Sequence, residues 1–325
     1  MTVDASCRVI LQALDPMHTE ERPMRTRAAV LPALALLALP LAACGGGDDD
    51  ERAIQEASDE GPCADAAADT LLAEVCDSGE LIVSTDPKYP PQSFLDKETG
   101  EYVGFDIDVA TEIADRMGLE VGWEAPSWGV LTAGTWNGRW DMSVGSMTVT
   151  IDRQKVLDFT QPYYYTPAVV VVHEDNTSIT DLATDLDGKK IGACASCTYP
   201  DYVNQTLRIK GYEFDFIIDD AVVSGYDTDT TALADLALGD GARLDAVITS
   251  LTTAQGYVDK GEPVKIVGDP VFYEPLAIAV DKDAEPDPDS FTETVDGIVG
   301  EMHKDGTLSD LSKKWYDGTD LTVKQ

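Results

Sequence analysis

The sequence predicts an α/β protein built from two lobes, each with its own hydrophobic core. From Leu81 onward, short apolar runs alternate with helical patterns, and a second series of the same kind follows Val169–Val172. Two extended segments, near Tyr165–Val172 and Tyr273–Val280, are expected to carry the chain out of the first lobe and back into it. With 325 residues, 43% of them hydrophobic, the chain is long and apolar enough to form both cores.

The individual strands and helices follow from the periodicity of the apolar residues. In the first lobe we expect strands at Leu81–Ser84, Val121–Trp123 and Met142–Gly145. One helix of this lobe has an apolar face and ends at Gly118; the face comprises Ile107, Ala110, Ile113, Ala114 and Met117. In the second lobe we expect strands at Lys190–Ala193, Phe214–Ile217 and Leu244–Ile248, and helices at Tyr199–Leu207 and Thr231–Leu238. Extended segments at Val264–Val267 and Pro270–Val280, then two amphipathic helices, are expected to close the chain.

The net charge of the chain limits which partners are expected. The formal net charge is −37, and all of it falls on residues 44–325, because residues 1–43 carry four acids and four bases. Such a surface repels phosphate, so nucleic acid is not an expected partner. We expect a solvated acidic shell that supports solubility.

The N-terminal residues are typical of an export leader, which we place at residues 1–43. Two arginines in Met24–Arg27 precede an apolar run, Ala28–Ala43, of sixteen residues with two prolines. This run is too short to span a membrane comfortably but suits the core of a signal peptide. The signal peptide is therefore expected at residues 24–43, with translation starting at Met24. The alternative is a buried hydrophobic helix.

The cysteines fit an exported protein. Leu41-Ala-Ala-Cys44 resembles a bacterial lipobox, in which the cysteine carries lipid and becomes the first residue of the mature chain. Residues 44–78 are polar, acidic and rich in alanine, which predicts a flexible tether. With Cys7 removed and Cys44 acylated, four cysteines remain, and pairing by proximity predicts the disulfides Cys63–Cys76 and Cys194–Cys197.

One stretch, Asp141–Arg153, has the composition of an anion-binding site. A short buried strand is followed by hydroxyl residues, including Ser146 and Thr148, and then by an arginine. Hydroxyls and free amides at the carboxyl end of a strand, beside the guanidinium of Arg153, suit a carboxylate held by two parallel hydrogen bonds. The alternative is that Arg153 forms a surface ion pair with Asp152 or Asp158.

The flanking motifs resemble the solute-binding proteins of polar amino acid ABC transporters, which form family 3 of the bacterial solute-binding proteins. The resemblance covers about Glu80 to Gly318, and four segments carry it: Gly104–Val121, Thr148–Arg153, Phe159-Thr-Gln-Pro-Tyr-Tyr164 and Glu301–Tyr316. It implies a fold like that of type II periplasmic binding proteins, with two Rossmann-like lobes joined by a two-strand hinge. Lobe 1 would comprise residues 79–168 plus 270–322, and lobe 2 residues 169–269. The solute would lie between the lobes at strand carboxyl ends.

The resemblance also implies which residues of this chain contact the solute. It places Asp86 and Tyr89 on the cleft wall and Trp128 opposite the tyrosine ring. Ser146 and Thr148 would offer hydrogen bonds, Arg153 would grip the carboxylate, and Cys197 and Thr198 would complete the carboxylate site from a helix N-terminus. For two of these residues a structural role is the alternative. Trp128 would then pack in the core, and Asp86 would cap the turn at Pro87.

Ser250 departs from the family pattern. Many members carry Asp at this position, where it pairs with the α-ammonium of the ligand, and serine lacks that charge. We expect either that Asp86, Asp229 or Glu274 takes over, or that the solute has no ordinary α-ammonium. For Asp229 the alternative is the N-cap of a helix beginning near Thr230.

These observations predict a lipid-anchored, extracytoplasmic monomer that captures a small amino acid-like or carboxylate-bearing solute and delivers it to a membrane permease. No cofactor and no metal site are expected. One alternative is an enzyme on the same scaffold, since some relatives act on prephenate or arogenate. However, the sequence has no Gly-x-Ser-x-Gly or His-Glu-x-x-His motif and no phosphate loop. Another is a thiol oxidoreductase that uses Cys194 and Cys197.

Overall fold

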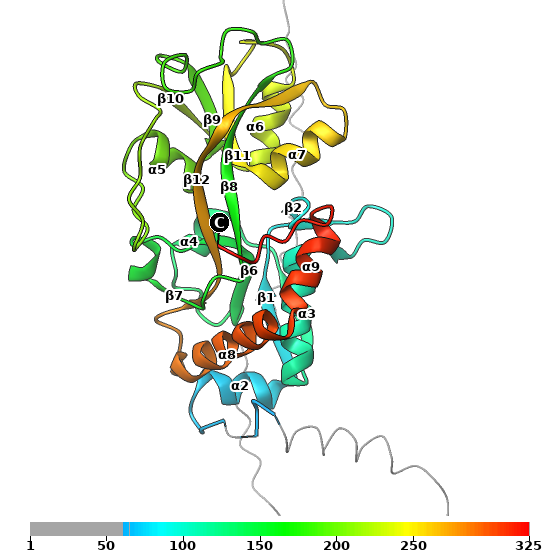
Figure 1. Cartoon of the computed structure of the whole chain (residues 1–325). Coiled ribbons are helices and arrows are strands. Elements are labelled where there is room, and N and C mark those ends of the chain that lie inside the picture. Colours follow the sequence, from blue (N-terminus) through cyan, green and yellow to red (C-terminus); the bar gives the residue numbers. More distant parts are fainter. Residues whose placement is uncertain (1–60, 65, 325) are drawn as a thin grey trace, which may run out of the picture. The chain divides into compact units, whose positions relative to one another are not determined.

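A computed structural model describes residues 61–64 and 66–324 of the chain. The predicted leader, the lipidation site Cys44 and the tether up to residue 60 lie outside the described residues. Within them, the two predicted α/β lobes are joined by two long strands, β8 (Tyr164–His173) and β12 (Val264–Asp281) (Figure 1). No helix in this described part is both long and apolar enough to cross a membrane.

The described residues contain one nine-stranded sheet that runs through both lobes. Its order is β10-β9-β11-β8-β12-β6-β1-β5, with β7 paired to β12. Lobe 1 contributes β1 (Glu80–Ser84), β5 (Glu120–Glu124), β6 (Met142–Thr148) and β7 (Leu157–Phe159). Lobe 2 contributes β9 (Lys190–Cys194), β10 (Val222–Tyr226) and β11 (Ala246–Ser250). A small second sheet in lobe 1 is formed by β2 (Lys88–Tyr89), β3 (Ser93–Leu95) and β4 (Tyr102–Val103).

Strands β8 and β12 form the predicted connection between the lobes. They pair antiparallel from Val264 opposite His173 to Leu276 opposite Tyr164, with one register shift between Val267 and Phe272. The pair lies at the centre of the strand order, between the strands of lobe 2 and those of lobe 1. The hinge is therefore part of the sheet itself.

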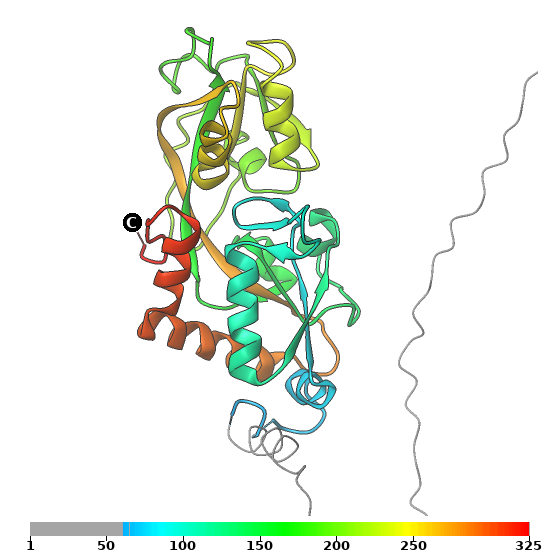
Figure 2. The same ribbon diagram turned by 90° about the vertical axis from the view of Figure 1, so that its right-hand side faces the viewer.

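Helices cover the sheet in both lobes. Those of lobe 1 are α2 (Leu71–Ser78), α3 (Phe105–Met117), α4 (Trp128–Thr132), the 3-10 turn η1 (Arg153–Lys155), α8 (Asp289–Asp305) and α9 (Thr307–Trp315). Those of lobe 2 are α5 (Tyr199–Val203), α6 (Asp229–Leu236) and α7 (Leu251–Asp259). Figure 2 shows α3 beside the two C-terminal helices, and its apolar residues share one core with theirs. As predicted, α3 ends at Gly118, which adopts a positive φ of 72°.

In lobe 2 the sheet is buried on both faces. Val170 and Val172 of β8 belong to one hydrophobic cluster, and Val169 and Val171 belong to another. Successive side chains of a strand point to opposite faces, so the two clusters lie on opposite sides of the sheet. Burial on both faces explains why this segment is continuously apolar rather than alternating.

The predicted flexible tether is wrong for residues 71–78, which form helix α2. Leu71, Leu72 and Val75 are buried in the core of lobe 1. Thr70 caps the helix by accepting a hydrogen bond from the Ala73 amide. The alanines and acids of this stretch suggested a tether, but three apolar residues on one helical face were enough to dock it. Both predicted cysteine pairs are bonded in the structure, and Cys63–Cys76 ties the segment before α2 to this helix.

Other element boundaries also differ from prediction. Phe214–Ile217 is not a strand: Phe214 and Phe216 instead pack against Tyr202 in the core of lobe 2, and the strand at the sheet edge is β10. The apolar residues of this run are buried in the core without forming a strand. The strand that pairs with β9 is β10, which follows later in the chain. Helix α5 ends at Val203, four residues before the predicted end, and β6 continues past Gly145 to Thr148.

The packing of α2 against the lobe 1 core predicts a measurable contribution to stability. Replacing buried Leu72 by alanine should lower the free energy of unfolding by about 2 to 4 kcal/mol, because it leaves a cavity in the lobe 1 core. Asp77→Ala, on the exposed side of the same helix, should change it by less than about 0.5 kcal/mol. Urea unfolding followed by circular dichroism measures both. Equal, small effects would mean that α2 is not docked.

Candidate functional site

A small pocket lies between the two lobes, with a cavity volume of about 30 Å³. Lobe 1 contributes Asp86, Tyr89, Trp128, Gly145, Ser146, Thr148 and Arg153. Lobe 2 contributes Cys194, Cys197, Thr198, Tyr199, Asp227, Thr228 and Asp229, and the hinge strand β12 contributes Glu274. Nine of the ten predicted contact residues line this pocket, and the exception is Ser250. The carboxyl ends of β6 and β9 both meet it, as expected for an open α/β sheet.

Arg153 is buried in the pocket wall, with 8% of its surface exposed. Its Nη1 donates to the Thr148 carbonyl (2.9 Å) and its Nη2 donates to the Ser196 carbonyl of lobe 2 (3.0 Å). A guanidinium has five N–H groups, so these two bonds fix its plane and leave three donors. Burial lowers the pKa of Arg153 to about 10, so the side chain stays charged at neutral pH.

The alternative role for Arg153, a surface ion pair, is wrong. Asp152 pairs instead with Lys155 and Arg208, and Asp158 pairs with Lys282. Within the described chain, Arg153 forms no ion pair with an acidic side chain.

Glu274 occupies the region that was assigned to the solute carboxylate. This hinge residue is 2% exposed, and its Oε1 accepts hydrogen bonds from the hydroxyls of Thr148 (2.7 Å) and Thr198. Burial raises its pKa, and the two hydroxyl bonds oppose that effect. The sequence analysis considered Glu274 only as a replacement acid. The available signal was a single acid inside the extended apolar segment Pro270–Val280.

Ser146 sits at a sharp bend of the backbone beside the pocket. It has a positive φ of 55°, and its amide donates to the Tyr163 hydroxyl (3.0 Å). Its hydroxyl donates to Oδ2 of Asp106 (2.8 Å), and the Tyr163 hydroxyl donates to the other carboxyl oxygen (2.7 Å). Burial raises the pKa of Asp106 to about 7. The Ser146 hydroxyl therefore serves an internal network that holds this bend, a role that the sequence analysis did not foresee.

Asp229 brings a carboxyl group to the opposite wall. It is the first residue of α6, and the N-cap is Thr228, so the alternative role of Asp229 as the N-cap is wrong. The residue is 4% exposed, and within the described structure its Oδ1 has no hydrogen-bond partner. Burial, followed by the charge of Glu274, raises its pKa to about 7. A buried carboxyl oxygen without a partner in a pocket wall marks a place for a donor from outside the chain.

Asp86 and Trp128 combine their pocket and structural roles. Oδ1 of Asp86 accepts the Lys88 amide (2.9 Å), which is the predicted turn cap, while the residue also lines the pocket; burial raises its pKa. Trp128 is half-buried against a hydrophobic cluster of lobe 1. Its indole Nε1 donates to the Ser196 carbonyl (3.1 Å), and its ring lies 5.6 Å from the Arg153 guanidinium carbon.

Ser250 does not line the pocket, and its assignment as a contact residue is corrected. It is fully buried as the N-cap of α7, where its hydroxyl accepts the Thr253 amide (3.3 Å). The Tyr89 hydroxyl donates to the same oxygen (2.9 Å) from lobe 1. The serine therefore removes no charge from the pocket, because the acid on this wall comes from Asp229 at the start of α6.

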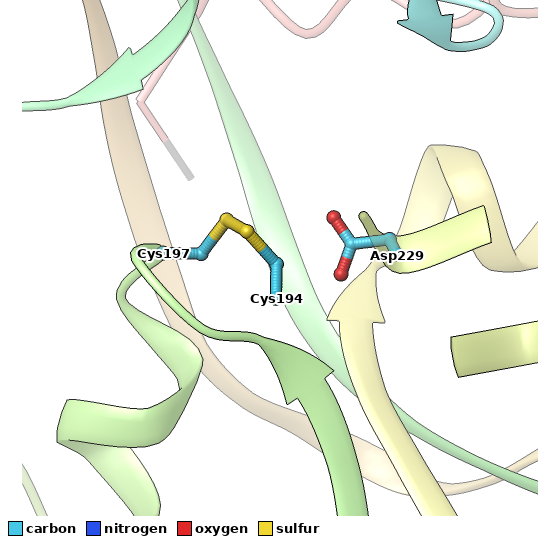
Figure 3. Close-up of side chains that lie close together, drawn as sticks. All are labelled: Cys194, Cys197 and Asp229. Carbon is cyan, nitrogen blue, oxygen red and sulfur yellow. A yellow bond between two sulfur atoms is a disulfide. The ribbon is translucent and has the colours of Figure 1, made fainter. Parts of the chain in front are cut away.

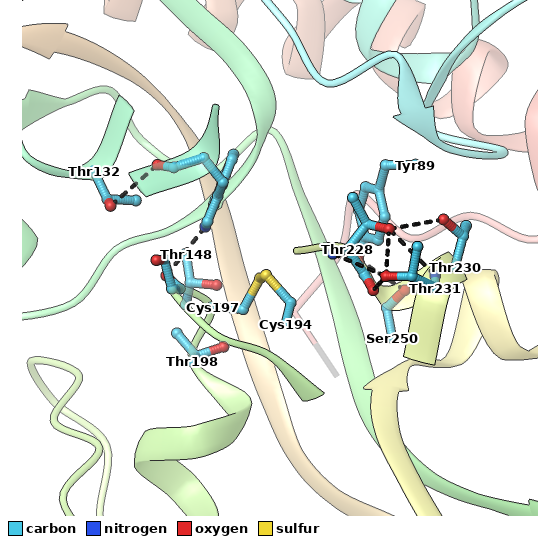
Figure 4. The surroundings of a disulfide bond; sticks show 12 residues. Tyr89, Thr132, Thr148, Cys194, Cys197, Thr198, Thr228, Thr230, Thr231 and Ser250 are labelled. Carbon is cyan, nitrogen blue, oxygen red and sulfur yellow. Dashed lines mark hydrogen bonds between the residues drawn. A yellow bond between two sulfur atoms is a disulfide. The ribbon is translucent and has the colours of Figure 1, made fainter. Parts of the chain in front are cut away.

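The disulfide Cys194–Cys197 lies in the lobe 2 wall. Figure 4 shows Thr148 and Thr198 on one side of it, and Thr228, Tyr89 and Ser250 on the other. Figure 3 shows the carboxyl group of Asp229 pointing toward the bridge, and the two sulfurs and a carboxyl oxygen lie within 4.8 Å of one another. Because the sulfurs are bonded to each other, neither is the thiolate that binds metal or attacks a disulfide. In this state the bridge shapes the wall.

Residues 81–318 match the model of a family described as bacterial extracellular solute-binding proteins, family 3. The L-cystine-binding protein TcyJ of Escherichia coli K12 is 29% identical over 257 residues, which cover 79% of this chain and 89% of that protein. The probable amino-acid-binding protein YxeM of Bacillus subtilis 168 is 30% identical, over 91% of this chain and 97% of its own length.

Among solved structures, the chain is similar to an ancestral amino acid-binding protein described as a precursor of cyclohexadienyl dehydratase. The two are 27% identical, with a TM-score of 0.64, and the match covers 75% of this chain and 98% of the ancestral one.

The placement of Ser250 predicts a structural phenotype. Ser250→Ala removes the cap of α7 and the acceptor of the Tyr89 hydroxyl, so the free energy of unfolding should fall by about 1 kcal/mol or somewhat more. Ser224→Ala, which removes from an intermediate position on β10 a hydroxyl that makes no hydrogen bond within the described residues, controls for the loss of a serine. Thermal and urea unfolding measure the difference. An unchanged stability of Ser250→Ala would contradict the capping role.

Proposed function

The chain belongs to family 3 of the bacterial extracellular solute-binding proteins, and from this premise we propose that it binds an amino acid in the pocket between its lobes. Its two-lobe fold is that of the type II periplasmic binding proteins. The relatives described above are binding proteins for amino acids or cystine by their names, and they are extracytoplasmic as members of this family. The chemistry of the pocket supports the same class of solute.

One observation carries the proposal: the pocket offers a fixed cation and an unpartnered buried acid. Arg153 has three N–H groups left after its backbone bonds, in the planar arrangement that matches a carboxylate. Oδ1 of Asp229 lacks a donor. An α-carboxylate on Arg153 and an α-ammonium on Asp229 would satisfy both groups at once. Movement of the lobes about β8 and β12 would admit the solute and then bury it.

Delivery and anchoring complete the proposal. We propose that the protein delivers its solute to an ABC transporter permease, the partner of this family. We also propose that it is a monomer on the outer side of the cell membrane. Cys44, with the signal-like run before it, is proposed to carry the lipid anchor. Mass spectrometry of the protein purified from its native membrane tests this point, because an unmodified Cys44 would rule the anchor out.

Binding without turnover is the proposed activity. Names of the relatives support binding over catalysis, although the ancestral structure shows that dehydratases arose on this scaffold. A reducible thiol site is disfavoured because the carboxylate of Asp229 beside the bridge would destabilise a thiolate. Recovering the bound amino acid unchanged after long incubation is the expected result, and a stoichiometric excess of product would favour an enzyme instead.

Arg153→Ala should weaken amino acid binding by roughly 10- to 100-fold, because it removes a charge-assisted hydrogen-bond partner of the carboxylate. Isothermal titration calorimetry measures this after a thermal-shift screen has identified a binding amino acid. Arg243→Ala, which removes an exposed arginine that pairs with Asp235 and does not line the pocket, should leave the affinity unchanged. Circular dichroism checks that both variants fold. Full affinity of a folded Arg153→Ala would remove this residue from the site.

Amino acid affinity should also rise with pH between 6 and 8. The pKa of Asp229 is raised to about 7 in the empty pocket, so below pH 7 its carboxyl is mostly neutral and above pH 7 it is mostly the anion that an ammonium binds. The ionised fraction, and with it the affinity, increases about tenfold across this range. Glu274 and Asp86 face the same pocket, and burial raises their pKa values too, so ionisation of either acid favours a bound ammonium in the same direction.

Asp229→Asn separates these contributions. Calorimetry at pH 6, 7 and 8 should show weaker binding at pH 8 than in the natural protein and a flatter dependence on pH. A pH slope that is the same in both proteins would assign the titration to another group.

A further inference from the structure

The pocket carries more buried negative charge than an ordinary zwitterion can balance. Three acids line it at buried or half-buried positions, Asp86, Asp229 and Glu274, against one cation, Arg153. With all four ionised, the charge of this set is −2, from three negative charges and one positive. A zwitterion adds no net charge, so it would leave this excess unchanged.

Arg153 does not neutralise the acids once a carboxylate is bound. It forms no salt bridge with the described acids, and its two hydrogen bonds go to backbone carbonyls, although its charge lowers the pKa of Glu274. Glu274 is held by threonine hydroxyls, which stabilise a carboxylate but bring no positive charge. In the proposed binding mode, the solute carboxylate takes Arg153 and the solute ammonium takes Asp229. Glu274 then shares Arg153 with the solute carboxylate, and Asp86 has no cation among the residues that line the pocket.

Burying an unpaired carboxylate away from water is unfavourable, and a cation within reach offsets part of that penalty. Lys88 lowers the pKa of Asp86 through its charge, but its side chain is exposed, so water screens that effect. Glu274 is 2% exposed, and the cation whose charge lowers its pKa, Arg153, is also the proposed partner of the solute carboxylate. The requirement for a second cation therefore falls most strongly on Glu274 and next on Asp86.

We infer that the solute is an amino acid with a net positive charge, whose second cationic group is received by Glu274 and Asp86. This inference rests on the proposed function, since it takes the carboxylate of the solute to be on Arg153. The unpartnered Oδ1 of Asp229 independently indicates that the pocket awaits a donor. The acids supply charge for ammonium or guanidinium groups, and Tyr89 and Trp128 supply ring surface for the aliphatic part of the side chain.

The test uses pairs of solutes that differ in one charge. Calorimetry at pH 8 compares L-arginine with L-citrulline and L-lysine with L-norleucine, and includes L-cystine. The cationic member of each pair should bind at least about tenfold more tightly, and cystine should bind no better than the neutral members. Tighter binding of the neutral members or of cystine would overturn this inference and leave amino acid binding intact. Failure of every amino acid would overturn both.

Agmatine, which is arginine without its carboxylate, separates the two proposals further. It should bind at least about tenfold more weakly than arginine, because it forgoes Arg153. Agmatine binding as tight as that of arginine, beside weak citrulline binding, would support the cation preference and contradict the carboxylate role of Arg153.

Variants of the pocket acids test where the second cationic group of the solute binds. Glu274→Gln keeps the size of the side chain and should lower the ratio of arginine to citrulline affinity by about tenfold, since only the arginine complex loses an ion pair. A merely structural role for Glu274 would lower both affinities equally and leave the ratio unchanged, which would overturn the assignment. Asp86→Asn should lower the ratio less. Glu98→Gln, the same substitution at an exposed turn, is the matched control and should not change it.

Discussion

A buried cation and a buried anion share one pocket wall, and the closed arrangement of the lobes depends on how they are held. Arg153 contacts a carbonyl of its own lobe at Thr148 and one of lobe 2 at Ser196. Glu274 accepts from Thr148 of lobe 1 and Thr198 of lobe 2. Removing each charge from water costs several kcal/mol, and these hydrogen bonds compensate for that cost only while the lobes are together. Closure of the lobes therefore depends on hydrogen bonds made by these two side chains.

The contrast between the cores and the cleft follows from the same constraint. Each lobe packs its own apolar clusters, whereas the contacts across the cleft are polar. Tyr89 bonds to Ser250, Gln92 bonds to Thr252, and the Trp128 indole bonds to the Ser196 carbonyl. Water can replace each of these hydrogen bonds when the lobes separate, but it cannot replace buried apolar contact at so small a cost. The cleft can open while both lobes stay folded.

Much of the site could be predicted because it lies in short, chemically distinctive segments. The hydroxyl-rich end of β6 followed by Arg153 predicts an anion-binding site from the sequence, and the structure places that arginine in the pocket wall. The presence of Glu274 beside these hydroxyl groups could not be predicted in the same way. Thr148 and Glu274 are 126 residues apart, and only pairing of β12 with β6 brings the acid onto the threonine hydroxyl. The sequence likewise did not decide between Asp229 and other acids as the replacement for the usual aspartate. The fold places Asp229 in the pocket lining, whereas Ser250 bonds to the Tyr89 hydroxyl outside it.

The sequence by itself determined the two-lobe α/β class, the two crossing strands, the pairing of neighbouring cysteines and most of the residues that line the pocket. The lobes and the crossing strands follow from local periodicity, the disulfides from the proximity of the cysteines, and most of the lining residues from motifs that resemble those of a known family. Only the tertiary structure decided that residues 71–78 belong to the core, that Thr228 rather than Asp229 caps α6, and that three buried or half-buried acids line a pocket with one arginine. Burial and electrostatic environment arise from segments far apart in sequence, so they exist only once the sheet has brought those segments together.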